Sequence, residues 1–364
     1  MSFTAISLFT GAGGMDVGFR EAGFDILWAN DINADACATY EANHDGIIRC
    51  GDLAEFMPEL DKYIGTDLVF GGPPCQGFSV AGKMDPEDVR SQQVFRFMDV
   101  VEKIQPKAFV LENVKALGQL DKWSPIRDTL FARAELLGFK FTQIVILNAT
   151  EFGVPQKRER MFFVGIKDPK GANVMNGIQQ YLNKYKSSAP KVGEIIKELG
   201  KAGSPSNNRI CTAKITTATK PVMRRSPYAG MMFNGAGRPI DPNGYANTLP
   251  ASMGGNKTPF VDENQIFHNK PSWIEQYHQK LMDGYEPEYS VAPSFLRRIT
   301  VDEALRIQTF PKNYDFKGRQ SSIYCQIGNA VPCKLASAVG SALMDMMLES
   351  YTATQRSKES ANPA

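Results

Sequence analysis

The chain has 364 residues, of which 43% are hydrophobic, so it can bury a large core, and its length favours two domains. The formal net charge is only +2, which excludes a general polycation, so a nucleic-acid surface would have to come from local clusters of charge. Six cysteines form no CxxC pair and three histidines have no zinc-ligand spacing, so neither a disulfide framework nor a metal site is expected, and a reducing cytosol is the default compartment.

The chain begins with a predicted strand rather than a targeting segment. Its first residues, MSFTAISLFTGAGG, lack the basic start of a signal peptide, and no apolar run approaches the ~18 residues of a membrane span. Apolar runs and helical spacing then alternate, which predicts an α/β fold with a doubly wound, mostly parallel sheet. The predicted strands cover residues 5–9, 25–29, 46–50, 67–70, 108–111, 141–147 and 161–164, and the predicted helices cover 15–22, 33–43, 93–104 and 124–137.

Glycines and polar residues stand where several of these strands end, and ligands bind at the carboxyl ends of strands in such sheets. The turn at 10–14, TGAGG, lets the backbone approach a ligand closely. Asp31 follows roughly 20 residues later, where a carboxylate accepts ribose hydroxyls. This pattern predicts an adenosine cofactor and leaves NAD and S-adenosylmethionine open. Phe9, just before the turn, is either a core aromatic or a cover for a cationic cofactor face.

Cys75 follows a strand end within GGPPCQGFSVAGK, residues 71–83. The two prolines each fix a φ angle and restrict the residue before them, so the turn is stiff. A thiol held in one orientation suits a nucleophile. A small buried cysteine after a turn is the ordinary alternative.

Two further motifs carry charged residues beside apolar strands. Glu112 ends a strand within LENV, where burial would raise its pKa and let it donate a proton to a ring nitrogen, and a helix-capping glutamate is the alternative. Arg158 and Arg160 precede the strand at 161–164. Their planar guanidinium groups suit a carbonyl oxygen or phosphates, and a charged strand edge is the alternative.

Taken in order, these motifs resemble the DNA (cytosine-5) methyltransferases of bacteria and phages. The resemblance implies a Rossmann-like methyltransferase fold and a sequence-specific enzyme that makes 5-methylcytosine. The matching segments span the chain and leave only its middle unmatched. They are SLFTGAGGMDVGF (7–19), WANDIN (28–33), GDL (51–53), GGPPCQGFSVAGK (71–83), LENV (111–114), FGVPQKRER (152–160), RRITVDEALRIQTFP (297–311) and QIGNAVP (326–332).

The resemblance also implies roles for individual residues. Cys75 would add to carbon 6 of a cytosine lifted out of the duplex. Glu112 would bind the N3 edge of the base and Arg160 its carbonyl, while Arg158 would support the Cys75 loop or bind a phosphate. S-adenosyl-L-methionine would be the cofactor, S-adenosyl-L-homocysteine the product, and no metal would take part. The implied cofactor residues are Phe9, Gly11, Gly13, Gly14, Asp31, Ile32, Asp52, Leu53, Pro74, Asn329 and Val331.

DNA contacts are expected from a loop and from the middle of the chain. Residues 80–91 would close behind the flipped base, with Ser79 and Arg90 contacting phosphate or the loop. The stretch 184–225 has ten Lys or Arg against two Glu, which predicts a phosphate-tracking surface in a domain that reads base edges in the major groove. Each candidate alone fits a phosphate contact or a solvated side chain better than a base contact. The candidates are Arg224, Arg225, Asn234, Arg238, Asn256 and Lys257.

The predicted domains are a catalytic domain at 1–170 and 310–350, a target-recognition domain at 171–296, a return segment at 297–309 and a disordered tail at 351–364. Double-stranded DNA is the expected substrate. A transfer-RNA (cytosine-5) methyltransferase and a catalytically silent DNA-binding regulator are the alternatives. The remaining expectations are a bacterial cytosolic or nucleoid location, no membrane, a monomer with a homodimer as the alternative, and a cognate restriction endonuclease as partner.

Overall fold

The structure is a computed structural model that describes residues 2–74, 92–170 and 173–361, with side chains described as far as residue 355 at the C-terminal end. The chain divides into two compact units and crosses between them four times. Unit 1 comprises Met1–Phe152, Glu159–Ser187 and Val331–Ala364, and unit 2 comprises Gly153–Arg158 and Ser188–Ala330.

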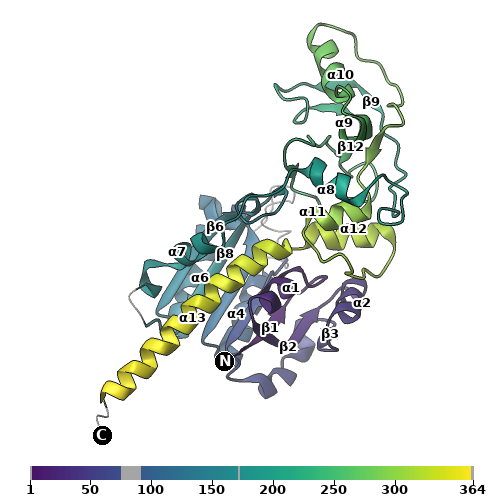
Figure 1. Cartoon of the computed structure of the whole chain (residues 1–364). Helices are drawn as coiled ribbons and strands as arrows, with labels where there is room; N and C mark the ends of the chain where they lie inside the picture. Colours follow the sequence, from purple (N-terminus) through teal and green to yellow (C-terminus); the bar gives the residue numbers. More distant parts are fainter. Residues whose placement is uncertain (1, 75–91, 171–172, 362–364) are drawn as a thin grey trace. The chain divides into compact units, whose positions relative to one another are not determined.

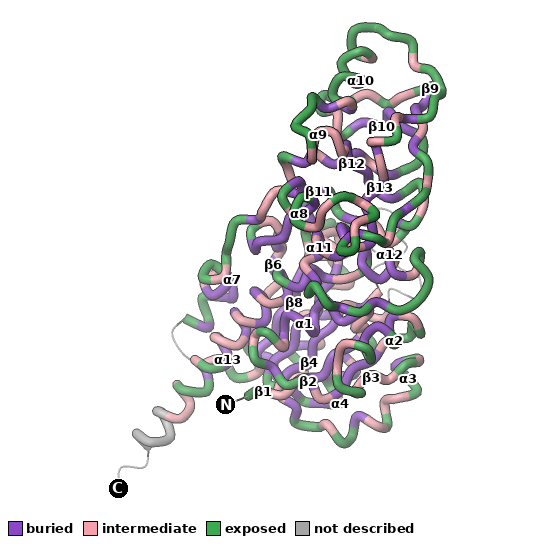
Figure 2. The backbone as a smooth tube through the Cα atoms, turned by 45° about the vertical axis from the view of Figure 1, so that its right-hand side comes forward, coloured by how far each residue is buried: buried purple, intermediate pink, exposed green. Residues whose placement is uncertain are grey.

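Unit 1 is built on a seven-stranded sheet with the strand order β3-β2-β1-β4-β5-β8-β6 (Figure 1). The first five strands are parallel to one another, and β8 is antiparallel to both of its neighbours. The central strands are buried along most of their length (Figure 2). This confirms the predicted doubly wound, mostly parallel sheet. The strands are β1 (Phe3–Leu8), β2 (Phe24–Asp31), β3 (Ile48–Cys50), β4 (Leu68–Gly71), β5 (Ala108–Val114), β6 (Phe141–Asn148) and β8 (Glu159–Ile166).

Helices cover both faces of this sheet because successive strand residues point to opposite sides. On β4, Val69 joins the apolar core beneath α4 and α6, whereas the ring of the next residue, Phe70, stacks on Phe19 of α1 with 4.3 Å between ring centroids. The helices of unit 1 are α1 (Gly14–Glu21), α2 (Ala34–Asn43), α3 (Leu53–Phe56), α4 (Gln93–Ile104), α5 (Lys115–Gln119), α6 (Ser124–Leu136), α7 (Ile178–Leu182) and α13 (Cys333–Ala361).

The last helix packs against the first one (Figure 1). A Cβ atom on Gly18 of α1 would lie 2.3 Å from the backbone nitrogen of Ser337 and 2.6 Å from the Cβ of Ala336, both on α13. Only glycine therefore allows the two helices to approach this closely.

The helical stretch Gln320–Gln355 is the one described segment long and apolar enough to cross a membrane, with a mean hydropathy of 1.2 in its most apolar window. Within the molecule 67% of that window is buried, and a core helix meets the same criterion. Its composition is therefore weak support for a membrane span.

The compact units have other limits than the predicted domains, and the predicted disordered tail lies in a helix. Helix continues to Ala361, where a disordered tail was expected, because the segment contains good helix formers and reaches its first proline only at Pro363. Residues 171–187 were assigned to the recognition domain, but α7 belongs to unit 1, where the Tyr181 hydroxyl donates to Glu349 on α13 at 2.6 Å.

Residues 310–330 were assigned to the catalytic domain, but they cluster with unit 2. The hydroxyl of Tyr324 donates to the carbonyl of Ile299 at 2.7 Å, and the amide of Gln308 donates to the carbonyl of Ile327 at 2.6 Å. These buried bonds tie α12 (Gln320–Asn329) to the segments on either side of α11 (Val301–Ile307), so the return to unit 1 comes only at Val331.

Unit 2 is a mixed assembly of short strands and helices around its own apolar cluster, which includes Phe233, Phe260 and Tyr277. Its strands are β7 (Gln156–Lys157), β9 (Thr217–Val222), β10 (Met231–Phe233), β11 (Ala246–Asn247), β12 (Phe260–Asp262) and β13 (Leu296–Arg298). Its helices are α8 (Val192–Leu199), α9 (Glu263–His268), α10 (Trp273–Met282), α11 (Val301–Ile307) and α12 (Gln320–Asn329).

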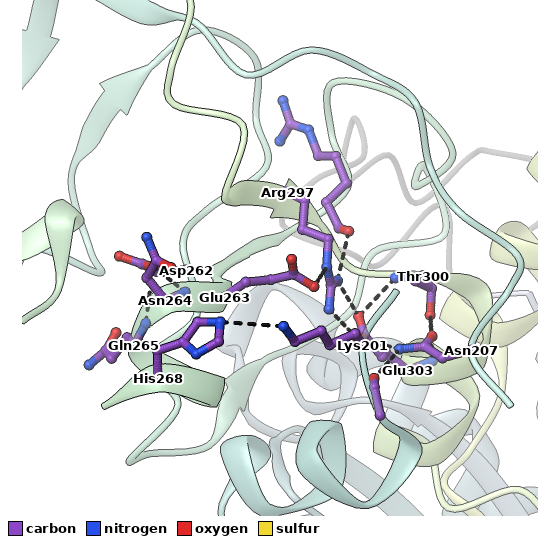
Figure 3. Close-up of polar contacts among 12 residues, drawn as sticks. Lys201, Asn207, Asp262, Glu263, Asn264, Gln265, His268, Arg297, Thr300 and Glu303 are labelled. Atoms are coloured by element: carbon purple, nitrogen blue, oxygen red, sulfur yellow. Dashed lines mark hydrogen bonds and ion pairs between the residues drawn. The ribbon is translucent and has the colours of Figure 1, made fainter. Parts of the chain in front are cut away.

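A buried ion-pair network holds several of these elements together (Figure 3). Two guanidinium nitrogens of Arg297 on β13 donate to the two carboxylate oxygens of Glu303 on α11, at 2.6 and 2.8 Å. Glu303 is fully buried and also accepts from the side-chain amide of Asn207 at 3.0 Å and from the backbone N–H of Thr300 at 2.9 Å. The Nε of Arg297 donates to Glu263 on α9 at 2.7 Å. One carboxylate thus joins a strand, a helix N-terminus and a loop.

Candidate active site

The polar residues singled out from the sequence lie along one edge of the unit 1 sheet. The five parallel strands run in the same direction, so their carboxyl ends, at Leu8, Asp31, Cys50, Gly71 and Val114, meet at that edge. Arg160 on the antiparallel β8 lies opposite Val114 in the register and therefore joins the same edge.

The glycine turn after β1 is held by a carboxylate. Gly11 and Gly13 have φ angles of 53° and 82°, and Phe9 shares this left-handed region with φ 54°, which is uncommon for an aromatic residue. The N–H of Gly11 donates to Asp31 Oδ2 at 2.8 Å, and the N–H of Asn33 donates to Asp31 Oδ1 at 2.8 Å. Burial raises the pKa of Asp31, and these backbone N–H bonds oppose that rise.

A second carboxylate lies at the end of the neighbouring strand. Asp52 is exposed and caps α3, where its Oδ1 accepts from the N–H of Ala54 at 2.9 Å. The side-chain amide of Asn30 donates to the carbonyls of Arg49 and Gly51, at 2.8 and 3.1 Å, which fixes the ends of β2 and β3 together. Beside these carboxylates, Ile32 is 71% exposed, whereas Leu53 is buried.

Glu112 and Arg160 form an ion pair at the centre of this edge. The Nε of Arg160 lies 3.0 Å from Glu112 Oε1, and both side chains are largely buried. The Nη1 of Arg160 donates to the carbonyl of Glu159 at 2.8 Å, which further fixes the guanidinium. A guanidinium at this distance stabilises the ionised carboxylate, whereas burial favours the protonated form. The raised pKa expected for Glu112 stays a prediction.

The segment that leads to Cys75 is fixed against Glu112 and its neighbour. A Cβ atom on Gly72 would lie 2.9 Å from Glu112 Oε2, so glycine allows this close approach. The side-chain amide of the buried Asn113 donates to the carbonyl of Pro73 at 3.1 Å. Because Pro73 and Pro74 have no N–H to donate, the ladder between β4 and β5 cannot continue through them, and the Asn113 side chain supplies a bond there.

Sequence reasoning placed Asn113 at the strand end beside Glu112 and Gly72 within the Cys75 motif, but it gave neither residue a role. The signal was present, because two consecutive prolines after a strand leave carbonyls that need donors from outside the ladder. The predicted residues Cys75, Ser79 and Arg90, and the loop 80–91, lie outside the described residues. Pro74 is described and half-buried.

The remaining predicted residues divide between the units. Val331 is buried in unit 1, and Asn329 is exposed in unit 2. Arg158 is also in unit 2 and is 1% exposed, and its Nη2 donates to the carbonyl of Gly328 at 3.0 Å. Its described bonds go to main-chain carbonyls, which indicates a supporting position rather than an exposed phosphate contact.

Several cations of the stretch 184–225 are paired with carboxylates and are therefore not available to DNA phosphates. Lys184 pairs with Asp345 at 2.9 Å and Lys186 with Glu151 at 2.8 Å, both in unit 1, and Arg209 pairs with Asp302 at 2.5 Å. Arg224 and Arg225 are exposed and have no acidic partner within the described part of the chain.

Among the other DNA candidates, the Asn234 side-chain amide donates to Thr216 Oγ1 and to the carbonyl of Thr217, at 2.9 and 2.8 Å, so its donors are engaged within unit 2. Arg238 donates to the carbonyl of Ala236 at 3.2 Å, and Asn256 and Lys257 are exposed. No cluster of three or more His, Cys, Asp or Glu suited to a metal ion occurs among residues 2–74, 92–170 and 173–361.

Comparisons with known proteins find relatives over nearly the whole chain. A profile of the family described as C-5 cytosine-specific DNA methylase matches residues 3–345. Type II methyltransferase M1.HphI of Haemophilus parahaemolyticus is 32% identical over 357 residues, which cover 95% of this chain and 88% of that protein. Type II methyltransferase M.HpaII of Haemophilus parainfluenzae is 30% identical over 356 residues, covering 96% and 91%. The solved structure of the S. pombe Dnmt2 methyltransferase has a TM-score of 0.65 at 17% identity and covers 95% of this chain and 98% of its own, a likeness of fold.

Proposed function

This chain belongs to the C-5 cytosine-specific DNA methylase family, and we propose that the groups at the carboxyl edge of its sheet carry out the family's reaction. It is a DNA (cytosine-5-)-methyltransferase, and its substrate is DNA. The observation that carries the assignment of the site is the Glu112–Arg160 ion pair, at 3.0 Å, beside the turn that leads to Cys75.

The residues at this edge fit S-adenosyl-L-methionine. A Cβ atom added to Gly11 would meet no atom within 4 Å, so the turn faces open space into which a ligand fits. Asp31 would bind the ribose, because each carboxylate oxygen accepts one backbone N–H and retains a lone pair for a hydroxyl. The exposed Ile32 would flank the adenine and Asp52 would accept from its amino group.

The remaining cofactor residues are proposed from the family resemblance. Phe9 and the glycines would line the methionine end, and the half-buried Pro74 would lie against the methyl donor. When bound, S-adenosyl-L-methionine supplies the methyl group that carbon 5 of cytosine receives. The full proposed set is Phe9, Gly11, Gly13, Gly14, Asp31, Ile32, Asp52, Leu53, Pro74, Asn329 and Val331.

The protein groups make the cytosine ring reactive. The Cys75 thiolate forms a bond to carbon 6, and the displaced electron pair makes carbon 5 nucleophilic. Glu112 hydrogen-bonds the N3 edge and Arg160 the carbonyl, where negative charge develops during the addition. After carbon 5 has been methylated, its proton passes to a base, for which we propose a water molecule. The electron pair of that C–H bond restores the double bond between carbons 5 and 6, and the Cys75 thiolate leaves.

We expect Glu112→Gln to slow methyl transfer by about 10²-fold while DNA and cofactor affinities change little, because the interaction strengthens only as charge develops on the ring. Single-turnover rates with saturating DNA measure the effect. Glu159→Gln is the control, because Glu159 is an exposed glutamate on the neighbouring strand β8 and its carboxylate pairs only with Lys115, at 2.8 Å, among the described residues. An unchanged rate in Glu112→Gln would refute the role of Glu112.

The exposed cations of unit 2 are proposed to track the DNA backbone. Replacing Arg224 and Arg225 together by glutamine should weaken DNA binding and lower the slope of log K against log salt by about 2, because each phosphate contact releases about one counterion. Lys184→Gln is the matched control, because Lys184 already pairs with Asp345 at 2.9 Å and belongs to unit 1. If the double variant keeps the wild-type slope, these arginines do not contact phosphate.

The function is tested by incubating the protein with labelled S-adenosyl-L-methionine and either duplex DNA or transfer RNA. Label in DNA alone, located at cytosine by bisulfite sequencing, is the expected result. Label in transfer RNA would favour the RNA enzyme, and DNA binding without transfer would favour the silent regulator. Both relatives are type II methyltransferases, and on that basis we infer a cognate restriction endonuclease as partner and a bacterial cytosolic or nucleoid location. We propose a monomer as the working state, with a homodimer as the alternative.

A further inference from the structure

Asp16 is a buried carboxylate directly behind the glycine turn. It lies in the first turn of α1, which begins at Gly14, and its exposed fraction is 0%. The hydroxyl of Tyr40 on α2 donates to its Oδ1 at 2.9 Å. Its other oxygen, Oδ2, is buried and has no hydrogen-bond partner among the described residues. The Ser7 hydroxyl, which also lacks a partner of hydrogen-bond geometry, lies close enough to lower the pKa of Asp16, so this oxygen is only weakly compensated.

The charge on Asp16 opposes folding at neutral pH. Burial raises the pKa of Asp16 to about 6, despite the lowering effects of Ser7, Tyr40 and Arg20. A carboxyl whose pKa is raised by folding contributes stability at low pH and loses it as the pH rises through about 6. Asparagine has nearly the same shape and would avoid this loss. An aspartate at this position therefore contributes its negative charge rather than its shape. No step of the mechanism above uses that charge.

Few neighbouring groups change charge in the same pH range. Burial lowers the pKa of His44 to about 4, so it stays neutral above pH 5. Burial raises the pKa of Cys333 well above its ordinary value, so it stays a thiol. The charged and titratable groups that interact with Asp16 are Arg20 on α1, Tyr40 on α2 and Cys333 on α13. His44, which follows α2, interacts with Arg20, and Glu21 interacts with Cys333.

The negative charge of Asp16 offsets a positive potential in the neighbouring cofactor site. The N-terminus of α1 carries a partial positive charge, and its N-cap, Gly13, offers no side-chain acceptor. The methyl donor proposed for this turn bears a sulfonium cation, which that helix end repels. The demethylated product is a neutral thioether at the same position. A carboxylate in the first turn offsets the positive charge of the helix end. This lowers the energy of the bound sulfonium cation and leaves that of the neutral thioether almost unchanged.

We propose that Asp16 is a specificity-determining residue whose negative charge makes the cofactor site prefer the sulfonium-bearing methyl donor over its thioether product. The inference rests on the proposed location of the cofactor at residues 9–14 and Asp31. It deepens that proposal, because it explains how the site favours release of product without a direct contact to the reacting atoms.

The test compares dissociation constants for S-adenosyl-L-methionine and S-adenosyl-L-homocysteine between pH 5 and pH 8, measured by calorimetry without DNA. In the wild type we expect the preference for the sulfonium to grow at least fivefold with pH, with a midpoint near the pKa of Asp16. In Asp16→Asn the ratio should be low and independent of pH. Both ligands carry the same ribose, so its hydrogen bonds to Asp31 contribute equally to the two dissociation constants. Burial also raises the pKa of Asp31, and the comparison of wild type with Asp16→Asn separates the titration of Asp16 from that of Asp31 and of the ligand amine.

The matched control is Asp25→Asn, because Asp25 is an exposed carboxylate near the amino end of β2, away from the site edge. It should keep the wild-type ratio at every pH. A pH-independent ratio in the wild type, or a wild-type profile in Asp16→Asn, overturns the inference, and the wild-type series decides even if the variant fails to fold. The proposed site fails separately if Asp31→Ala leaves both dissociation constants unchanged.

Discussion

A Cys75→Ala variant transfers no methyl group to DNA at a measurable rate, and its affinity for S-adenosyl-L-methionine stays within about threefold of wild type. The thiolate is the group that makes carbon 5 nucleophilic, and alanine offers no substitute. The cofactor groups, by contrast, lie at the ends of β1, β2 and β3, and the turn before Cys75 is held by Gly72 and by the Asn113 bond to Pro73 at 3.1 Å. Labelled methyl transfer and calorimetry measure the two quantities.

DNA containing 5-fluorocytosine separates the role of Cys75 from a general loss of activity. With this base the wild type should form a covalent adduct that survives denaturing electrophoresis, because carbon 5 then carries no proton to remove. Cys75→Ala should form none. Cys50→Ala, which alters the one exposed cysteine within the described residues, should form the adduct at the wild-type rate. An adduct in Cys75→Ala would assign the nucleophile to another residue.

Glu303→Ala should destabilise unit 2 by about 3–5 kcal/mol, because it leaves the Arg297 guanidinium buried without its bidentate partner. Glu303 is fully buried, and its removal also leaves the side-chain amide of Asn207 and the backbone N–H of Thr300 without an acceptor. Urea denaturation followed by hydrogen exchange in each unit measures the loss. Amides of unit 1 should keep their protection at urea concentrations that expose unit 2.

Glu198→Ala is the matched control for this network. Glu198 is an exposed glutamate that pairs with Lys312 at 3.0 Å on the surface, so its removal should cost at most about 1 kcal/mol. Replacing Arg297 and Glu303 together by Met and Leu should recover part of the stability, because no unpaired buried charge remains. A loss below about 1 kcal/mol in Glu303→Ala would mean that the network contributes little to folding.

The sheet and most of the site edge could be predicted from the sequence. Buried parallel strands read as short apolar runs between helical segments, and residues such as Asp31 and Glu112 stand where those runs stop. The carboxyl ends of parallel strands lie at one edge of a sheet, so these residues were expected to meet there.

The contacts between distant segments could not be predicted. In the sequence Lys184 has no acidic residue nearby and was interpreted as a free cation. In the structure it lies 2.9 Å from Asp345, which follows 161 residues later. The limits of the compact units differ from the predicted domain limits for the same reason, since the Tyr324 hydroxyl donates to the carbonyl of Ile299 across the end of the recognition segment. The polar composition of residues 351–361 resembles that of disordered tails and led to the prediction of disorder. The same residues continue the last helix, α13.

The packing of α13 against α1, with Gly18 beside Ala336, has a consequence for synthesis on the ribosome. Helix α1 is among the first segments to emerge, yet the helix that covers it is encoded more than 300 residues later. At 5–20 residues per second, the nascent chain waits on the order of 15–60 s with that face of its first helix open to water or to a chaperone. An early stop codon anywhere before α13 would therefore release a polypeptide with an uncovered apolar face, so quality-control proteases should clear such fragments rapidly.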